Sequence, residues 1–358
     1  MRVDQFIPAF HRGDAIGDTA FHMRNFLRSQ GFISDIYCLN HDPDLEGEAR
    51  LFDSYPSPAA SDVAILHYAL PSPLTQGLMK LPCKKAIVYH NITPHEFFAP
   101  FSREMADIAR AGRLELATLV PHLDLALADS EFNRRELLKL GCRRAEVLEL
   151  FVDFGKYEKP PSSFVHDLFR DDRTNILFVG RIAPNKKIED LIKVAFYYKK
   201  YISPLVRLVV VGKTSALPSY YNGLIRMADE FYLQPEEIHF SGHIPDEELF
   251  ALYRAADVFL SLSEHEGFCL PLLESMVFDV PIIAYNCTAV PYTLDGAGVL
   301  INNKRVDRVA ELVDLVTRDA GLRKRIIQGQ RERLQRYKEG RRDQFLFESL
   351  RRLAGERP

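Results

Sequence analysis

Two glutamates stand eight residues apart in the segment SEHEGFCLPLLESM, which spans residues 263–276. Glu266 follows an apolar run in an expected loop, and Glu274 falls in the first turn of an expected helix. Pro271 suits the first position of this helix, where its missing N–H group needs no partner. The free N–H groups of a helix start bind anions, and a carboxylate accepts hydrogen bonds from sugar hydroxyls. The segment predicts a site for a diphosphate and a sugar, although Glu274 alone could simply complement the helix dipole.

A second loop supplies positive charge. The segment LFVGRIAPNKKIEDLI, residues 177–192, is typical of a strand, a loop and a helix, and it places Arg181 and Lys186 in the loop. Two fixed cations at the carboxyl end of a strand can neutralise a departing diphosphate. The competing interpretation is a basic loop that is simply solvated.

A third segment, HRGDAIGDTAFHMRNFL at residues 11–27, joins an expected strand to an expected helix. Gly13 and Gly17 permit a close turn, and the helix start again favours anions. Asp14 and Asp18 could orient sugar hydroxyls or cap the helix. A pair of glycines is a weak signal, so a plain turn is the alternative.

His90 ends the apolar run of IVYHNITPHEFF and is expected at the carboxyl end of a strand, where ligands bind. A lone histidine is more often structural, and His67 and His95 are weaker candidates than His90. The spacing of His11, His22 and His243 from the cysteines and aspartates is not that of metal ligands. Asp42 and Asp44 lie in a polar loop, so we expect no metal site there.

Length and composition restrict the class of protein. The chain has 358 residues, more than one hydrophobic core usually serves, which predicts two domains. Its net charge of −3 gives no general attraction to nucleic acid. The first residues lack the apolar core of a signal peptide, and no apolar run of about 18 residues predicts a membrane span. Five scattered cysteines without a CxxC pair predict reduced thiols, and we expect a cytoplasmic protein.

Short apolar runs alternate with helical segments, which predicts α/β domains with parallel sheets covered by helices. A proline-rich and charged stretch at 158–174 predicts a linker between domains at 1–157 and 175–335, and helix 336–358 is expected to pack back on the first domain. Two doubly wound, Rossmann-like domains facing each other across a cleft would bind ligands outside the carboxyl ends of their strands. The expected strands are 3–8, 34–39, 63–68, 85–90, 125–130, 145–150, 175–180, 206–212, 238–242, 258–263 and 281–286, and the clearest expected helices are 18–31 and 130–141.

The segment SEHEGFCLPLLESMVFDVPIIAYN closely resembles the motif of two glutamates separated by seven residues in retaining family-4 glycosyltransferases of the GT-B fold. GRIAPNK, residues 180–186, is similar to a second pattern of that family, except that Lys187 stands where glycine is common. The resemblance covers nearly the whole second half of the chain and, more weakly, the first half. It implies catalytic roles for four residues, with Arg181 and Lys186 at the leaving group and Glu266 and His90 beside the donor sugar.

The resemblance also implies the other binding residues. Glu274 would bind the ribose, the backbone near Ile244 would contact the nucleobase, and His90 would contact the transferred sugar. The first loop would approach the donor diphosphate and the acceptor. The implied donor-binding residues are Gly17, Ile244, Gly267, Phe268, Cys269, Leu270 and Glu274, and the implied acceptor-binding residues are Gly13, Asp14 and Asp18.

The implied activity is transfer of a sugar to a glycan hydroxyl with retained anomeric configuration and without an essential metal. The strings NITP, SEHEGFC and AVPYTLDGAGVL are similar to bacterial O-antigen mannosyl- and rhamnosyltransferases, which favours GDP-mannose over UDP-sugars and a lipid-linked or polysaccharide acceptor. Two alternatives stay open, a GT-B-fold sugar-nucleotide epimerase and a nucleotide-sugar-binding protein without catalysis. Basic residues at 134, 135, 139, 143 and 144 could touch anionic lipid at the inner face of the cytoplasmic membrane or form a solvated helix face.

Overall fold

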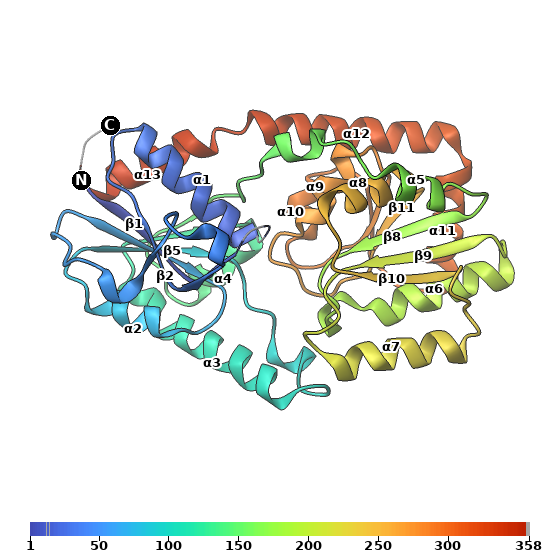
Figure 1. Cartoon of the computed structure of the whole chain (residues 1–358), viewed down its shortest axis with the longest axis horizontal. Helices are drawn as coiled ribbons and strands as arrows, with labels where there is room; N and C mark the ends of the chain where they lie inside the picture. Colours follow the sequence, from blue (N-terminus) through green and yellow to red (C-terminus); the bar gives the residue numbers. More distant parts are fainter. Residues whose placement is uncertain (12, 14, 356–358) are drawn as a thin grey trace. The chain divides into compact units, whose positions relative to one another are not determined.

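The computed structural model describes residues 1–11, 13 and 15–355, which divide into two compact units (Figure 1). The first unit comprises Met1–His95, Glu104–Asp153 and the C-terminal stretch from Gly340. The second comprises Glu96–Arg103 and Phe154–Glu339. Each unit is a parallel sheet covered by helices, which confirms the predicted pair of Rossmann-like α/β domains.

A parallel sheet in the order β3-β2-β1-β4-β5-β6-β7 forms the centre of the first unit. The central strands are buried on both faces, which is why the sequence shows continuous apolar runs there and no alternation. The strands are β1 (Val3–Phe10), β2 (Ile36–His41), β3 (Arg50–Leu51), β4 (Val63–Tyr68), β5 (Lys84–Tyr89), β6 (Leu125–Ala128) and β7 (Ala145–Val147).

Residues that favour helix termini stand at the starts and ends of helices in the first unit. The Ser130 hydroxyl accepts the N–H of Asn133 at 3.3 Å and caps α4 (Glu131–Lys139). Gly31 and Gly141 follow α1 (Ala15–Ser29) and α4 with φ of +83° and +88°, the left-handed conformation that ends many helices. The other helices are α2 (Pro73–Lys80), α3 (Arg103–Leu119) and α13 (Arg342–Leu353).

One hydrophobic cluster joins the C-terminal helix to the sheet of the first unit. Met23 and Leu27 of α1 pack with Val3 of β1, and Leu346 and Leu350 of α13 belong to the same cluster. Full burial of one leucine side chain contributes about 2 kcal/mol. The apolar face of α13 therefore accounts for its place in the first unit.

The sheet of the second unit has the order β10-β9-β8-β11-β12-β13. The chain starts at β8 in the middle, moves outward through β9 to β10, and then crosses to β11 on the other side of β8. Ligands of such sheets bind at the carboxyl ends of the strands where the order reverses, which here is the edge after β8 and β11. The strands are β8 (Thr174–Val179), β9 (Val206–Val211), β10 (Ile238–Gly242), β11 (Val258–Ser261), β12 (Ile282–Tyr285) and β13 (Val299–Ile301).

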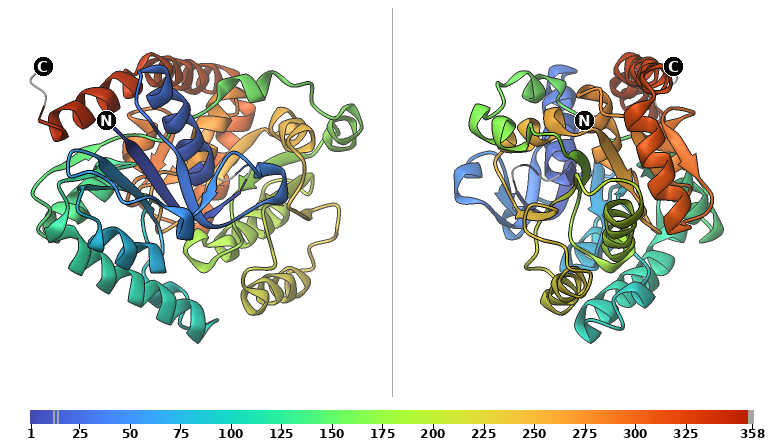
Figure 2. Two further views of the ribbon diagram at one scale, coloured as in Figure 1. Left: turned by 60° about the vertical axis from the view of Figure 1, so that its left-hand side comes forward. Right: turned by 90° about the vertical axis from the view of Figure 1, so that its right-hand side faces the viewer.

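Helices cover both faces of this second sheet (Figures 1 and 2). Helix α6 packs on β9 beside α7 and α11, whereas α8 packs on β8, α9 on β12, and α12 on α9. The helices are α5 (Ser163–Phe169), α6 (Ile188–Tyr201), α7 (Pro218–Glu230), α8 (Asp246–Ala255), α9 (Leu270–Val277), α10 (Val290–Leu294), α11 (Val306–Arg318) and α12 (Ala320–Glu339).

The stretch 158–174 differs from the linker that its composition predicts. It contains α5, which packs against α8 inside the second unit. The Ser162 hydroxyl caps α5, and the Ser162 N–H donates to the Glu247 carbonyl at 2.8 Å. A helix of seven residues is too short to show a clear period in the sequence. The short strands β3 and β13 lie outside the expected strands for the same reason.

The buried carboxyl group of Asp4 makes the stability of the first unit depend on pH. The side chain is buried, its Oδ1 accepts the N–H of Asp35 at 3.0 Å, and burial raises its pKa from the ordinary 3.8 to about 6. The folded state therefore binds the proton more tightly than the unfolded state, so stability falls as the pH rises from about 4 to about 6. We expect Asp4→Asn to raise the free energy of unfolding at pH 7.5 by at most about 3 kcal/mol, at about 1.4 kcal/mol per pKa unit.

Urea unfolding of both proteins at pH 7.5 and pH 4.5 measures this difference. The gain should shrink at the lower pH, where the wild-type carboxyl is protonated in the folded state. An equal gain at both pH values would show that ionisation of Asp4 is not its source.

Candidate active site

The two loops that the sequence singled out meet through an ion pair. Glu266 lies in the loop after β11, and its Oε2 is 2.5 Å from Lys186 Nζ in the loop after β8. The Glu266 and Lys186 side chains are 6% and 15% exposed, so the pair is shielded from most of the solvent. A pair with so little water around it interacts more strongly than a pair on the surface.

Backbone contacts fix both loops in place. The Thr288 hydroxyl accepts the N–H of Glu266 at 2.8 Å and donates to the Glu266 carbonyl at 2.9 Å. Asn185 Nδ2 donates to the His265 carbonyl at 2.9 Å, and the Glu264 N–H donates to the Asn185 carbonyl at 2.8 Å. The Glu266 carboxylate is therefore held by its backbone as well as by Lys186, as a preorganised site requires.

Glu274 is a buried and oriented carboxylate on α9. Its Oε1 accepts the hydroxyl of Tyr157 at 3.0 Å, and its Oε2 accepts the hydroxyl of Tyr253 at 2.9 Å. Burial and the adjacent carboxylate raise the pKa of Tyr253 well above its usual range, so its hydroxyl stays a donor. Each carboxylate oxygen keeps a further lone pair for a ligand hydroxyl. The two tyrosine hydroxyls therefore orient Glu274 for a ligand, which is more than a carboxylate that only complements the dipole of α9 would need.

The start of α9 leaves N–H groups for an anion. Cys269 adopts φ of +73° at the N-cap, which turns the chain sharply before Leu270. The Phe268 carbonyl accepts the Thr293 hydroxyl, so this carbonyl is already bonded within the unit. Within the described part of the chain, no acceptor binds the N–H groups of Phe268, Cys269 and Leu270. Gly267 precedes them in the same loop.

Two cysteine thiols line the same loops. Burial and the neighbouring Glu266 carboxylate raise the pKa of Cys269 well above its usual range. Burial raises the pKa of Cys287 to about 12, and its Sγ donates to the Ser263 carbonyl at 2.9 Å. Both thiols therefore stay protonated at neutral pH and are poor nucleophiles.

A row of basic residues at this sheet edge includes one that the sequence analysis missed. Arg181, Lys213 and His243 directly follow glycines at the ends of the neighbouring strands β8, β9 and β10. All three side chains are exposed, and within the described residues none of them has a side-chain hydrogen bond or ion pair. A glycine followed by a basic residue recurs at 180–181, 212–213 and 242–243, and this repeated pair is the sequence signal that could have predicted a role for Lys213. Ile244 follows His243 and is half-buried.

The backbone conformation of Lys187 explains why glycine suits this position. Its φ and ψ are +54° and +47°, the left-handed conformation that glycine adopts without steric cost. Its Nζ lies 3.4 Å from Glu264 Oε2 and 3.6 Å from Glu189 Oε1. These carboxylates hold the lysine side chain beside the loop that carries Lys186.

Among the predicted residues of the first unit, Gly13 and His90 follow strands, whereas Gly17 and Asp18 lie in α1. Gly13 adopts φ of +70° in the turn after β1, and the exposed Asp18 lies in the first turn of α1. Gly17 lies inside α1 and not in the turn, and this position suits glycine because a Cβ there would approach the His11 carbonyl oxygen to 2.5 Å. Asp14 lies outside the described residues. His90 follows β5, and both of its ring nitrogens have partners within this unit.

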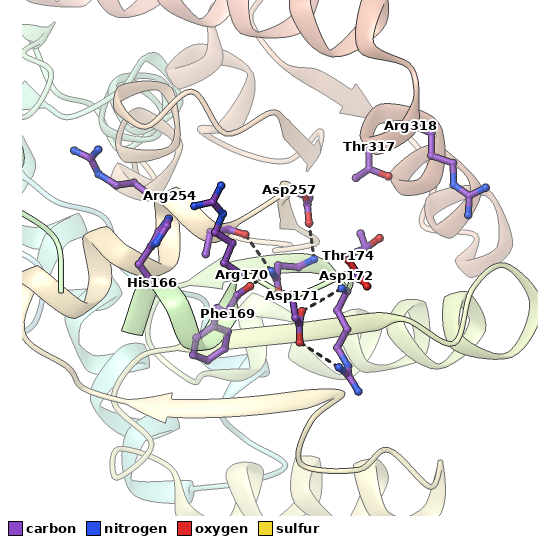
Figure 3. Close-up of a pocket in the computed structure, with 13 residues that line it drawn as sticks. His166, Phe169, Arg170, Asp171, Asp172, Thr174, Arg254, Asp257, Thr317 and Arg318 are labelled. Carbon is purple, nitrogen blue, oxygen red and sulfur yellow. Dashed lines mark hydrogen bonds and ion pairs between the residues drawn. The ribbon is translucent and has the colours of Figure 1, made fainter. Parts of the chain in front are cut away.

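A pocket with a volume of about 350 Å³ lies elsewhere in the second unit (Figure 3). It opens at the amino end of β8, the opposite edge of the sheet from Arg181 and Glu266, and no predicted site residue lines it. Asp171 in its wall is bonded to Arg173 at 3.1 Å and to Arg207 at 2.5 Å. Among the residues that the structure describes, no group of three or more His, Cys, Asp or Glu side chains is placed to hold a metal ion.

Comparisons with known proteins agree with this geometry. Residues 162–333 match the family described as Glycosyl transferases group 1. The chain is 29% identical over 324 residues to O-antigen chain mannosyltransferase B of Escherichia coli, covering 86% of this chain and 77% of that protein. It is 29% identical over 231 residues to a GDP-mannose-dependent alpha-mannosyltransferase of Mycobacterium tuberculosis, covering 62% of this chain and 55% of that protein.

A solved structure extends the likeness to the whole fold. Anabaena Alr3699/HepE, in complex with UDP-glucose, superposes with a TM-score of 0.75 at 16% identity and covers 98% of this chain and 99% of its own. Together with the family match, this superposition confirms the GT-B fold that the sequence predicted.

Proposed function

We propose that this chain, whose residues 162–333 match the family described as Glycosyl transferases group 1 and which is similar to bacterial mannosyltransferases, transfers mannose from GDP-mannose to a glycan hydroxyl with retained anomeric configuration. The observation that carries the proposal is the Lys186–Glu266 pair at the carboxyl edge of the second sheet, with Glu274 and the start of α9 beside it. Carboxylates that accept from the hydroxyls of the sugar and the ribose, cations beside the diphosphate, and N–H groups at a helix start are what a nucleotide sugar needs. The GDP-mannose-dependent relative supports GDP, and the UDP-glucose complex of the structural neighbour keeps UDP as the alternative.

The proposed mechanism gives each group one task. Arg181 and Lys186 neutralise charge on the departing diphosphate, and the N–H groups of Phe268, Cys269 and Leu270 bind its oxygens. Glu274 binds ribose hydroxyls, with its carboxylate oriented by Tyr157 and Tyr253. Glu266 accepts hydrogen bonds from hydroxyls of the transferred sugar and fixes its orientation. The acceptor hydroxyl attacks the anomeric carbon from the face that the diphosphate leaves, the bond between that carbon and the diphosphate oxygen breaks, and the hydroxyl proton passes to the departing diphosphate. Attack on this face retains the anomeric configuration.

Calorimetric titration with GDP and UDP, without metal and then with magnesium, tests the donor site. We expect GDP to bind at least about tenfold more tightly than UDP, which is about 1.4 kcal/mol, with no effect of magnesium. A preference for UDP would overturn the GDP proposal, and an absence of binding to both would overturn the donor site. Product analysis with and without a mannan acceptor then separates transfer from epimerisation, because an epimerase converts the donor alone.

Arg181→Met and Lys213→Met test the basic row. We expect Arg181→Met to lower kcat by about 100-fold, because a charged donor aimed at the leaving group is worth about 3 kcal/mol. We expect Lys213→Met to weaken GDP binding by about tenfold through loss of one charge-assisted contact. Lys324→Met, on the exposed side of α12, is the matched control and should change neither quantity. Wild-type kcat in Arg181→Met would contradict its role at the leaving group.

Three of the five basic residues that the sequence offered for contact with an anionic acceptor form ion pairs with glutamates. Arg134 and Arg135 both bond to Glu131, and Arg144 bonds to Glu146. Contact with an anionic, lipid-linked acceptor would therefore depend most on the exposed residues 139 and 143. Within the described residues, no helix has the length and apolar character needed to cross a lipid bilayer.

A further inference from the structure

A chain of buried polar side chains crosses four neighbouring strands of the first unit. Asp129, after β6, has its Oδ2 2.9 Å from His90 Nδ1, and His90 Nε2 is 3.0 Å from His67 Nδ1. His67 Nε2 is 2.9 Å from Gln5 Oε1 on β1, and Gln5 Nε2 is 3.0 Å from the Ala20 carbonyl in α1. The His90 and Asp129 side chains are 3% and 4% exposed, and His67 and Gln5 are buried. We call these four side chains the relay.

The direction of each hydrogen bond follows from Ala20, whose carbonyl can only accept. Gln5 must therefore donate its amide NH₂ to Ala20 and present Oε1 to His67. Because Oε1 only accepts, His67 carries its proton on Nε2, and its Nδ1 is an acceptor. Burial and the neighbouring His90 hold the pKa of His67 well below its usual range, so its ring stays neutral.

His90 must then donate its Nε2 proton to His67 Nδ1. Its other nitrogen faces Asp129, and one proton lies between them, either on His90 Nδ1 or on the carboxyl group. Both placements give the pair a net charge of zero, which a buried site favours because an unpaired charge there would lose its hydration. Burial raises the pKa of Asp129 and the bonded His90 opposes that rise, in agreement with a shared proton.

We propose that Asp129 and His90 share one proton in a buried neutral pair, and that His67 and Gln5 couple the state of this pair to helix α1. If the shared proton leaves, His90 keeps one proton and can donate to only one of its two partners. A donation to Asp129 forces His67 to reverse, and then Gln5, whose oxygen would face the Ala20 carbonyl. Loss of the proton therefore weakens the attachment of α1 to β1. The turn with Gly13 lies immediately before α1.

This arrangement gives His90 a different task from the sugar contact that the resemblance implied. Both of its ring nitrogens are bonded inside the unit, so a sugar hydroxyl could reach a nitrogen only by breaking the relay. His90 is a positioning residue that acts through Asp129 and His67. The inference does not depend on the proposed donor.

Other titratable groups near the relay are bonded elsewhere. Glu136 binds Arg113 and accepts the hydroxyl of Tyr89, and Arg24 of α1 binds Glu48. His22 of α1 binds Asp343, and Asp18 is exposed at the start of α1. Asp4, next to Gln5 on β1, accepts the N–H of Asp35, and burial raises its pKa to about 6, so it is already ionised at alkaline pH. Within the relay, the Asp129–His90 pair is the unit that can lose a proton.

Nitrogen-detected NMR of the full chain labelled with ¹⁵N-histidine tests the proton positions at pH 7. His67→Gln and His90→Gln assign the two signals, and the exposed His122 serves as the reference for a solvated ring. We expect His67 to be protonated on Nε2 alone, and His90 to carry a proton on Nε2 and to share another with Asp129. An unprotonated Nε2 on His90 would overturn the proposal.

Hydrogen exchange of α1 from pH 6 to 9.5 tests the coupling. The asparagine amide of Asp129→Asn can donate to Nδ1 of a neutral His90, so this variant keeps every hydrogen bond without a shared proton. We expect protection of α1, relative to α4, to fall by at least about tenfold at alkaline pH in the wild type and to stay constant in Asp129→Asn. The same pH dependence in both proteins would overturn the coupling. If the variant does not fold, the NMR result alone decides.

Discussion

Replacing Glu266 with glutamine should lower kcat for sugar transfer by at least about 100-fold, or about 3 kcal/mol. The carboxylate is 6% exposed, and its distance of 2.5 Å from Lys186 makes it the ion partner of the cation assigned to the leaving group. Glutamine keeps the shape but loses the charge, so Lys186 is no longer fixed and the sugar hydroxyls lose a strong acceptor. Steady-state kinetics with GDP-mannose and a mannan acceptor measure the effect.

The affinity for GDP distinguishes a specific loss of kcat from a general defect in folding or in the donor site. In the proposed site the ribose binds Glu274, and Arg181 and the N–H groups at the start of α9 still bind the phosphates, so Glu266→Gln should bind GDP within about threefold of the wild type, which is about 0.7 kcal/mol. Glu230→Gln, an exposed glutamate at the end of α7, is the control and should leave kcat unchanged. Near-normal turnover in Glu266→Gln would remove Glu266 from the catalytic site.

Local signals in the sequence place the candidate active site. Arg181 comes directly after the run NILFVG, and Glu266 lies in the loop that follows the run VFLSLS; such apolar runs mark buried parallel strands. The carboxyl ends of neighbouring parallel strands lie at the same edge of a sheet, so both residues were expected together. Glu274 follows Pro271 by three residues, which predicted it in the first turn of a helix; α9 begins at Leu270, so Glu274 lies on this helix just beyond its first turn.

The residues that orient this site left no such signal. Thr288 binds Glu266 from 22 residues away, and Tyr157 binds Glu274 from 117 residues away. Contacts at these separations leave no period in the sequence. Gln5 did leave a trace, since a polar side chain in a strand that is buried on both faces needs a buried partner. Nothing in the sequence showed that its partner was His67.

The largest structural effect is expected from Gly212→Ala. Gly212 directly follows β9, and its N–H donates to the Gly242 carbonyl at 2.9 Å. The Gly180 N–H donates to the Val211 carbonyl at 2.9 Å. These bonds hold the strand ends so closely that a Cβ on Gly212 would lie 1.8 Å from the Gly180 carbonyl oxygen. Because that atom is backbone, the ends of β8 and β9 must separate. We expect the free energy of unfolding to fall by about 3 kcal/mol or more, measured by urea unfolding.

The same separation should weaken GDP binding while the variant is still folded, because Gly180 directly precedes Arg181 and Gly212 precedes Lys213. Gly329→Ala is the matched control, since no atom lies within 4 Å of its added Cβ in the interior of α12. Alanine is the better helix former, so this control should gain about 0.5–1 kcal/mol and bind GDP normally. If Gly212→Ala kept the wild-type stability and GDP affinity, the close approach of β8 and β9 would not be what positions the basic row. A large loss in Gly212→Ala alone would tie the packing of two strand ends to the binding of the diphosphate.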